Sequence, residues 1–209
     1  MAKNALWHFS RKEQRDLLIS WVTLSIAFAI VISPSFLGFF SDLEALLIAF
    51  VSVGTGFVFH ELAHRQAARS FGFVSEFRMW KEGLIIALGI AVISMGNLVF
   101  AAPGATYFFG TNVTREQNGK ISIAGPITNI IVGFVLVSLL LVAPNVFIGK
   151  IIFNAAWINF WFAFFNLLPI FPLDGAKVLA WNPGAWVVTI AVAGLMSFMP
   201  GILLALIGV

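Results

Sequence analysis

Two histidines and a glutamate of this chain have a spacing that suits a metal ion. The run His60-Glu61-Leu62-Ala63-His64 places the two imidazoles four residues apart. In a helix, residues i and i+4 lie on one face, so both imidazoles can bind the same ion. Glu61 lies beside them and can take a proton from a water molecule that the ion activates. The pattern therefore predicts a zinc site with Glu61 as a general base.

A zinc ion in such a site needs a third protein ligand and one open position. Asp174 is the candidate, in the run Asn166-Leu-Leu-Pro169-Ile-Phe-Pro172-Leu-Asp174-Gly175. Proline cannot continue a helix, so the two prolines predict an unwound helix end from which Asp174 can turn back into the bundle. Taken alone, an aspartate between a proline and a glycine is more often part of a surface turn. The chain has no cysteine, which excludes thiolate ligands.

The composition predicts that these residues lie in a membrane. Hydrophobic residues make up 60% of the 209 residues and charged residues only 10%, against roughly 25% charged in an ordinary soluble domain. The net charge of +3 is small, and the cations cluster at the ends of apolar stretches. That pattern is typical of membrane orientation and not of nucleic-acid binding. Ionisable residues inside a span are costly and are functional by default, which favours a metal site.

The apolar stretches predict an all-α integral membrane fold, a polytopic bundle of five to six transmembrane helices. Predicted spans cover about residues 17–40, 45–70, 121–142, 151–168 and 185–209. The two histidines fall in the second span, and Asp174 follows the fourth. Residues 71–83 have mixed composition and are predicted to be an interfacial strand or loop. We expect residues 1–209 to form a single domain without a separate soluble domain.

The charges also predict the orientation of the chain. Basic residues precede the first span and follow the second, so the positive-inside rule places the N-terminus and the region after His64 in the cytoplasm. The charged loop predicted at 114–120 belongs on the same side. A single crossing by residues 84–110 would place that loop outside and Asp174 opposite the histidines. We therefore expect 84–110 to be re-entrant, a short helix in and a strand back, with a full span as the alternative.

Taken together, the motifs resemble those of the site-2 proteases, a family of intramembrane zinc metalloproteases. The resemblance rests on HELAH in an early span, on Gly125–Pro126 with Asn129 in a middle span, and on NLLPIFPLDG at the end of a later one. It covers a catalytic core of about residues 45–180. Residues 84–110 form a longer apolar insert than the compact strand region of the family.

The resemblance implies a role for each candidate residue. His60, His64 and Asp174 would be the ligands of one zinc ion per chain, and no other cofactor is expected. Glu61 would be the catalytic base. Asn166 resembles the asparagine that helps to position the substrate or to stabilise the oxyanion.

The resemblance also implies the reaction. It is the hydrolysis of a peptide bond within the transmembrane segment of a membrane-anchored substrate, as in regulated intramembrane proteolysis. The expected partners are a transmembrane protein substrate and the lipid bilayer, without nucleic acid. Many relatives carry an appended PDZ or CBS domain for which this chain has no room, so an accessory protein could supply recognition. We expect a prokaryotic cell membrane as the location, with the N-terminus and the active-site face in the cytoplasm.

Two other functions stay open from the sequence. A zinc-binding membrane protein without protease activity, such as a transporter or a scaffold, would use the two histidines and Asp174 but give Glu61 no task. A purely structural membrane subunit would carry HELAH as an accident at the membrane interface.

Overall fold

The computed structural model describes residues 9–33, 36, 42–99, 103–110, 112–199 and 201. These residues form helices almost throughout, together with one two-stranded sheet. In chain order the elements are α1 (Arg11–Ile32), α2 (Leu43–Val53), the π-helical turn η3 (Gly54–Val58), α3 (Phe59–Ser70), β1 (Val74–Met79), α4 (Lys81–Ile93), β2 (Gly104–Phe109), α5 (Arg115–Leu140), α6 (Val146–Asn166), α7 (Asp174–Trp181) and α8 (Pro183–Phe198).

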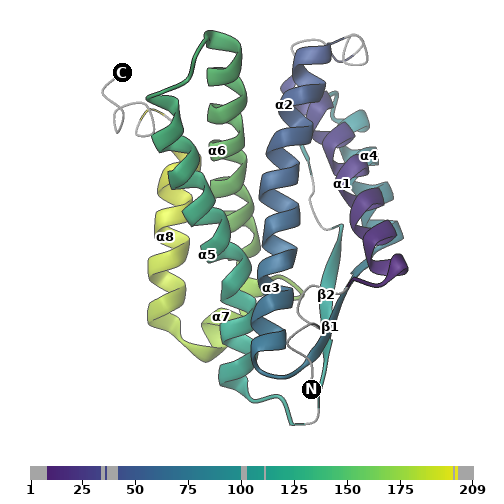
Figure 1. Cartoon of the computed structure of the whole chain (residues 1–209), viewed down its shortest axis with the longest axis vertical. Coiled ribbons are helices and arrows are strands. Elements are labelled where there is room, and N and C mark those ends of the chain that lie inside the picture. The colour runs from purple at the N-terminus through teal and green to yellow at the C-terminus, as the bar shows by residue number, and fades with distance from the viewer. Residues whose placement is uncertain are drawn as a thin grey trace.

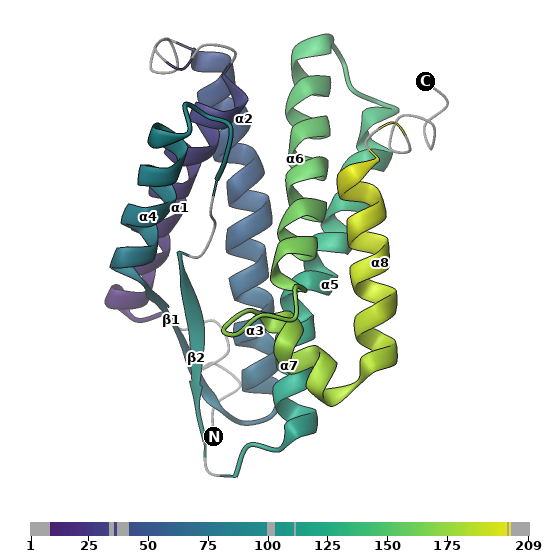
Figure 2. The ribbon, with the colours of Figure 1, turned by 180° about the vertical axis from the view of Figure 1, so that it is seen from behind.

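The long helices stand side by side in two groups (Figures 1 and 2). One group contains α1, α2 with its continuation α3, and α4, and the other contains α5, α6 and α8. The sheet lies beside α3 near one end of the molecule, where the short helix α7 also approaches. Elements from both groups therefore meet around α3.

Four helical segments are long and apolar enough to cross a membrane, namely Arg11–Ile32, Leu43–Ser70, Arg115–Leu140 and Val146–Asn166. The chain is therefore a helical membrane protein. The predicted number of five to six spans is not confirmed, because α8 has 16 residues in the part that the structure describes, whereas a span needs about 20. The predicted span ends at 37–40 and 202–209 lie outside the described residues, as does Pro34.

Capping residues explain why two helices begin before the predicted spans. α1 begins at Arg11 and not near residue 17, because the Ser10 hydroxyl accepts the Glu13 backbone N–H at 3.1 Å. Likewise α6 begins at Val146 and not at residue 151, because the Asn145 side chain caps the helix at its start. Hydropathy marks the part of a helix that lipid can cover, whereas the cap decides where the helix begins.

The predicted polar loop at 114–120 is wrong for the same reason. These polar residues form the cap and first turns of α5, which begins at Arg115. The Thr114 hydroxyl accepts the Gln117 backbone N–H at 3.1 Å, and the Gln117 side chain accepts the Thr114 backbone N–H at 3.0 Å. This reciprocal capping box satisfies two N–H groups that a helix start would otherwise leave without partners.

The second predicted span is one continuous helix that contains an unpredicted π-helical turn. Leu43–Ser70 runs through α2, η3 and α3 without a break. π-Helical turns are rare and are frequently found at functional sites. A Cβ at Gly56 would lie 3.0 Å from the Phe162 ring, so a glycine here lets α6 pack closely against the turn. The turn leads directly into the histidine pattern of α3.

The segment that follows the sheet leaves it and returns to it. β1 and β2 pair antiparallel, with Val74 opposite Phe109 and Met79 opposite Gly104. The Trp80 backbone N–H donates to the Pro103 carbonyl at 2.8 Å, so the chain returns beside the point where it left as α4. A short helix followed by a returning strand is the path that the sequence predicts for residues 84–110. Where the membrane lies relative to this path stays a prediction.

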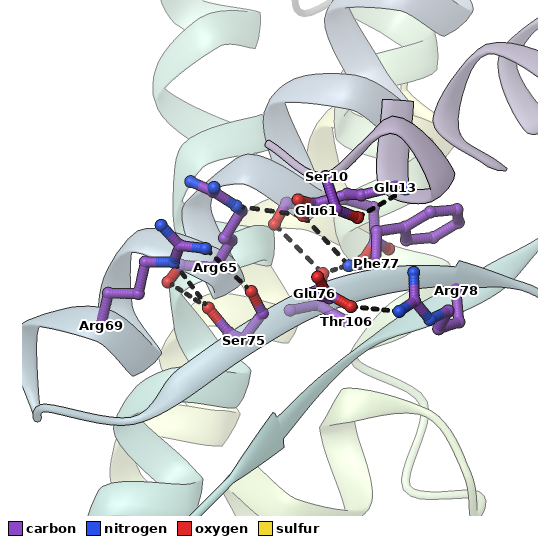
Figure 3. A network of polar contacts seen from close by, with 10 residues as sticks. All are labelled: Ser10, Glu13, Glu61, Arg65, Arg69, Ser75, Glu76, Phe77, Arg78 and Thr106. Atoms are coloured by element: carbon purple, nitrogen blue, oxygen red, sulfur yellow. Dashed lines mark hydrogen bonds and ion pairs between the residues drawn. The ribbon is translucent and has the colours of Figure 1, made fainter. Parts of the chain in front are cut away.

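A buried ion pair holds α1, α3 and β1 together. Arg65 Nε on α3 donates to Glu13 Oε1 on α1 at 3.0 Å, and both side chains are at most 1% exposed. The same oxygen accepts the Phe77 backbone N–H from β1 at 3.2 Å. Figure 3 shows the three groups converging between the helices and the sheet. Glu13 lies before the predicted first span, and its role in fixing the sheet to α3 was not predicted.

We predict that Glu13→Ala destabilises the protein strongly. Removal of one partner of a buried ion pair typically costs about 3–5 kcal/mol, because the other charge loses its compensation. The matched control is Glu44→Ala, which removes an exposed ion pair with Lys150 and should cost about 0–1 kcal/mol. Thermal unfolding in detergent measures both. Equal effects of the two changes would contradict the role of Glu13.

Candidate active site

His60, His64 and Asp174 meet in the interior between α3 and α7. The Nε2 atoms of the two histidines are 2.9 Å apart. Asp174 Oδ2 lies 3.3 Å from His60 Nε2 and 3.0 Å from His64 Nε2. His60 and His64 are buried and Asp174 is nearly so. The structure thus brings together the three side chains that the sequence predicts as metal ligands.

The geometry of the three donors fits a zinc ion. Zinc binds imidazole nitrogen at about 2.0–2.1 Å in tetrahedral sites, which places two ligand atoms roughly 3.3 Å apart. The three donor atoms here have separations of 2.9, 3.0 and 3.3 Å. A Cβ at Gly125 of α5 would lie 2.5 Å from His64 Nε2 and 2.7 Å from His60 Nε2. The missing side chain at Gly125 therefore keeps space open beside both nitrogens.

A close backbone approach delivers Asp174 to the histidines. α6 ends at Asn166, and the chain unwinds through the segment with Pro169 and Pro172 before α7 begins at Asp174. A Cβ at Gly175 would lie 2.0 Å from the Leu167 carbonyl oxygen. Only glycine therefore lets the start of α7 pack against the end of α6. The predicted unwinding at the prolines is confirmed.

The histidine nitrogens on the far side from Asp174 are held by oxygen acceptors. His60 Nδ1 lies 2.6 Å from Asn129 Oδ1, and His64 Nδ1 lies 2.8 Å from the Ile121 carbonyl. An oxygen without a proton can only accept, so each Nδ1 carries the hydrogen. Each Nε2 then presents its lone pair to the shared space, and histidines that bind zinc are commonly oriented in this way by an acceptor on the other nitrogen.

Further amides fix the orientation of Asn129. Asn129 Nδ2 donates to the Gly56 carbonyl at 2.7 Å and to Asn159 Oδ1 at 3.0 Å, so its oxygen faces His60. Asn159 Nδ2 donates in turn to Thr55 Oγ1 at 3.1 Å. Asn129 and Asn159 are both fully buried. Asn129 is part of the resemblance, but its contact with His60 was not predicted. A polar amide within a predicted span is the signal that could have indicated such a contact.

Glu61 lies at a cavity of about 560 Å³ next to the three ligands. Its walls come from α3, from β2 and from the segment after α6, and they include Asn166. One side-chain N–H of Asn166 donates to the Phe162 carbonyl of its own helix at 3.0 Å. Thr106 of β2 donates its hydroxyl to Glu61 Oε2 at 2.8 Å. Thr106 was not predicted from the sequence, because a threonine in a strand belongs to no motif.

The carboxylate of Asp174 has a cation beside it that favours its ionised form. Lys177 Nζ lies 3.6 Å from Asp174 Oδ1. An ionised carboxylate is the form that binds a metal ion.

Known proteins with similar sequences are named as zinc metalloproteases. A protein of Methanocaldococcus jannaschii named "Putative zinc metalloprotease MJ0611" is 43% identical over 197 residues, which cover 93% of this chain and 98% of that protein. The chain belongs to the site-2 protease family. It is thus a member of a family of zinc metalloproteases, and His60, Glu61, His64, Asn166 and Asp174 of its motifs line one cavity.

Two further relatives of this site-2 protease are longer proteins. "Zinc metalloprotease MJ0392" of the same archaeon is 28% identical over 137 residues, or 64% of this chain and 32% of that protein. A Mycobacterium tuberculosis protein named "Putative zinc metalloprotease Rip3" is 29% identical over 125 residues, or 57% of this chain and 27% of that protein. No family model matches the chain, and no solved structure matches it.

Because Gly125 leaves space beside both histidines, we predict that Gly125→Ala abolishes most zinc binding without unfolding the chain. The added methyl group would occupy the space beside His60 Nε2 and His64 Nε2. The matched control is Gly89→Ala in α4, where a Cβ meets nothing within 4 Å. Metal analysis of the purified variants measures their zinc content. Full zinc content in Gly125→Ala would refute the assignment of that space to the metal ion.

The contact between His60 and Asn129 predicts a second effect on zinc. Asn129→Leu should weaken zinc affinity by about 10–100-fold, because the leucine leaves the orientation of His60 without support. Asn129→Asp keeps an oxygen acceptor for His60 Nδ1 and should lose less. Competition with a zinc chelator measures both affinities. Equal affinity of Asn129→Leu and the wild type would show that His60 needs no such partner.

Proposed function

We propose that this chain is an intramembrane zinc metalloendopeptidase that hydrolyses a peptide bond within the transmembrane segment of a membrane-anchored substrate. One observation carries the proposal: two histidines, an aspartate and a glutamate meet at a cavity within a bundle of apolar helices. Charged groups in such a place are costly unless they bind something. Relatives named as zinc metalloproteases supply the class of reaction.

In this proposal His60, His64 and Asp174 hold one zinc ion per chain. When bound, zinc lowers the pKa of a water molecule toward about 7 and polarises the carbonyl of the substrate. Glu61 would take a proton from the attacking water molecule, whose oxygen forms the new bond to the carbonyl carbon, and would then give that proton to the nitrogen of the leaving amine. The C–N bond breaks, and the products are a carboxylate and an amine.

We assign Asn166 to the developing oxyanion. It lines the cavity together with Glu61 and Asp174. Its amide carries two N–H donors, of which one is used by the Phe162 carbonyl. The second can donate to the negative charge that forms on the substrate oxygen, a contribution that preorganised donors commonly make.

Strand β2 is the proposed docking edge for the substrate. It forms one wall of the cavity through residues of 104–108. Among the described residues its sheet has only two strands, in the order β1-β2, so β2 has a second edge. A transmembrane helix must unwind before a protease can reach its carbonyl groups, and an extended chain can pair with a free strand edge.

The chain would sit in a prokaryotic cell membrane as a single multi-pass domain over residues 1–209, with five to six spans. The N-terminus and the active-site face would lie in the cytoplasm, since Arg65 and Arg69 lie just beyond the histidines. α4 and β2 would form the re-entrant region, which is tolerated because β2 lines the cavity. The lipid bilayer and a transmembrane protein substrate would be the partners, and an accessory protein could select the substrate.

Zinc content and cleavage, measured side by side for the wild type and Glu61→Gln, test the proposal. We expect about one zinc ion in each protein, because Glu61 is not a ligand. Only the wild type should cut a model transmembrane substrate in detergent, with the rate of the variant reduced by at least about a hundredfold, as general acid–base catalysis typically contributes.

The same experiment separates the proposal from the other two functions. Zinc in both proteins with no cleavage by either would favour a transporter or a scaffold. Absence of zinc from both would leave only a structural subunit. Equal cleavage by the two proteins would remove Glu61 from the reaction.

A further inference from the structure

We infer that Thr106 is the positioning residue of the general base Glu61, and that it ties the base to strand β2, the wall of the cavity. This inference rests on the proposed function, in which Glu61 moves the proton. It adds a residue from the sheet to a site whose other groups come from helices and from the segment that leads into α7.

The hydroxyl of Thr106 points at the Glu61 carboxylate. Thr106 Oγ1 lies 2.8 Å from Glu61 Oε2 and 3.3 Å from the Glu61 carbonyl oxygen. A hydroxyl has one proton to donate, and the shorter contact to an ionised oxygen is the stronger of the two. Glu61 Oε2 is therefore held by the strand, and Oε1 is the oxygen that can accept the proton of the water.

The position of Thr106 follows from the alternation of the strand. Along β2, residues 104, 106 and 108 are half-buried and residues 105, 107 and 109 are exposed. Successive side chains of a strand point to opposite faces, so Thr106 faces α3 by register. A slip of one residue would turn Ala105 or Tyr107 toward Glu61 and remove this donor from it.

The register is fixed by contacts that lead back to the active-site helix. Thr106 is paired with Phe77 of β1. The backbone N–H of Phe77 donates to Glu13, which accepts from Arg65 on α3. Arg65 lies one helical turn after Glu61. The contacts thus close a ring from Glu61 through β2, β1 and α1 back to α3, as Figure 3 shows.

A second set of contacts holds β1 to the same helix. The Ser75 hydroxyl donates to the Arg65 carbonyl at 3.1 Å. Arg69 donates from Nε to Ser75 Oγ at 3.2 Å and from Nη2 to the Ser75 carbonyl at 3.1 Å. Two successive turns of α3 therefore bind β1 by hydrogen bonds, and β2 is held in place by its pairing with β1. Any displacement of β2 moves Thr106 and hence the carboxylate.

The consequence is that the strand that would receive an extended substrate also orients the base. A substrate paired with the second edge of β2 would restrain the strand on which Thr106 sits. Loss of the hydroxyl should therefore slow the chemical step more than it weakens binding of the substrate, because the backbone of β2 stays in place.

Thr106→Val tests this inference with a change of nearly equal volume. We expect kcat to fall about 10–100-fold, the typical effect of losing a hydrogen bond to a charged group, with KM changed by less than about twofold and zinc content unchanged. Thr106→Ser keeps the hydroxyl and should restore kcat to within about threefold of the wild type. Thr189→Val is the matched control, because its hydroxyl bonds to carbonyls of α8.

Three results would overturn the inference: a kcat of Thr106→Val equal to that of the wild type, an equal loss in Thr106→Ser, or a loss confined to KM. A wild type that binds zinc and cuts nothing would instead refute the proposed function. In that case, thermal unfolding tests whether Thr106 and Glu61 are energetically coupled. Thr106→Val should lower the melting temperature of the wild type but not that of Glu61→Ala, and equal shifts in both backgrounds would show that the two residues are not coupled.

Discussion

The structure depends on holding two imidazoles and a carboxylate inside an apolar bundle at about the distance that separates two ligand atoms on one metal ion. His60 Nε2, His64 Nε2 and Asp174 Oδ2 are separated by 2.9–3.3 Å, and their desolvation is costly unless a cation occupies the space between them. Close backbone approaches make this meeting feasible. Gly125 keeps the space beside the nitrogens open, and Gly175 lets α7 begin against the end of α6.

The polar groups around the site are satisfied mostly by other protein groups, and these contacts also set its geometry. Asn129 joins His60 to the π-helical turn and, through Asn159, to α6. On the opposite side, the buried pair of Glu13 and Arg65 fixes the sheet to α3. Helices α5 and α6 thus support the predicted zinc ligands, whereas α1 and the sheet support the proposed base. The two groups of helices also meet through apolar contacts, such as the stacking of Phe28 on α1 with Phe162 on α6.

The sequence predicted which side chains meet at the site better than it predicted what supports them. The spacing of His60 and His64 is itself a helical signal, and the prolines before Asp174 predicted the unwound end that the structure contains. Helices begin before the predicted spans, because hydropathy marks the segment that lipid can cover, whereas Ser10 and Thr114 cap the helices earlier. Thr106 belongs to no motif, since its contact with Glu61 depends on strand register across 45 residues of chain. Long-range pairing of this kind cannot be read from local composition.

A protease that cuts inside the membrane is recognised by the position of the cut in its substrate. Zinc-loaded protein should be incubated in lipid vesicles with a single-span substrate, and the masses of both products should be determined. We expect two products whose masses sum to that of the substrate plus one water, with the cut inside the apolar segment and no products after zinc is removed by a chelator. A cut confined to the water-exposed flanks of the substrate, or cleavage that persists without zinc, would refute the proposed reaction.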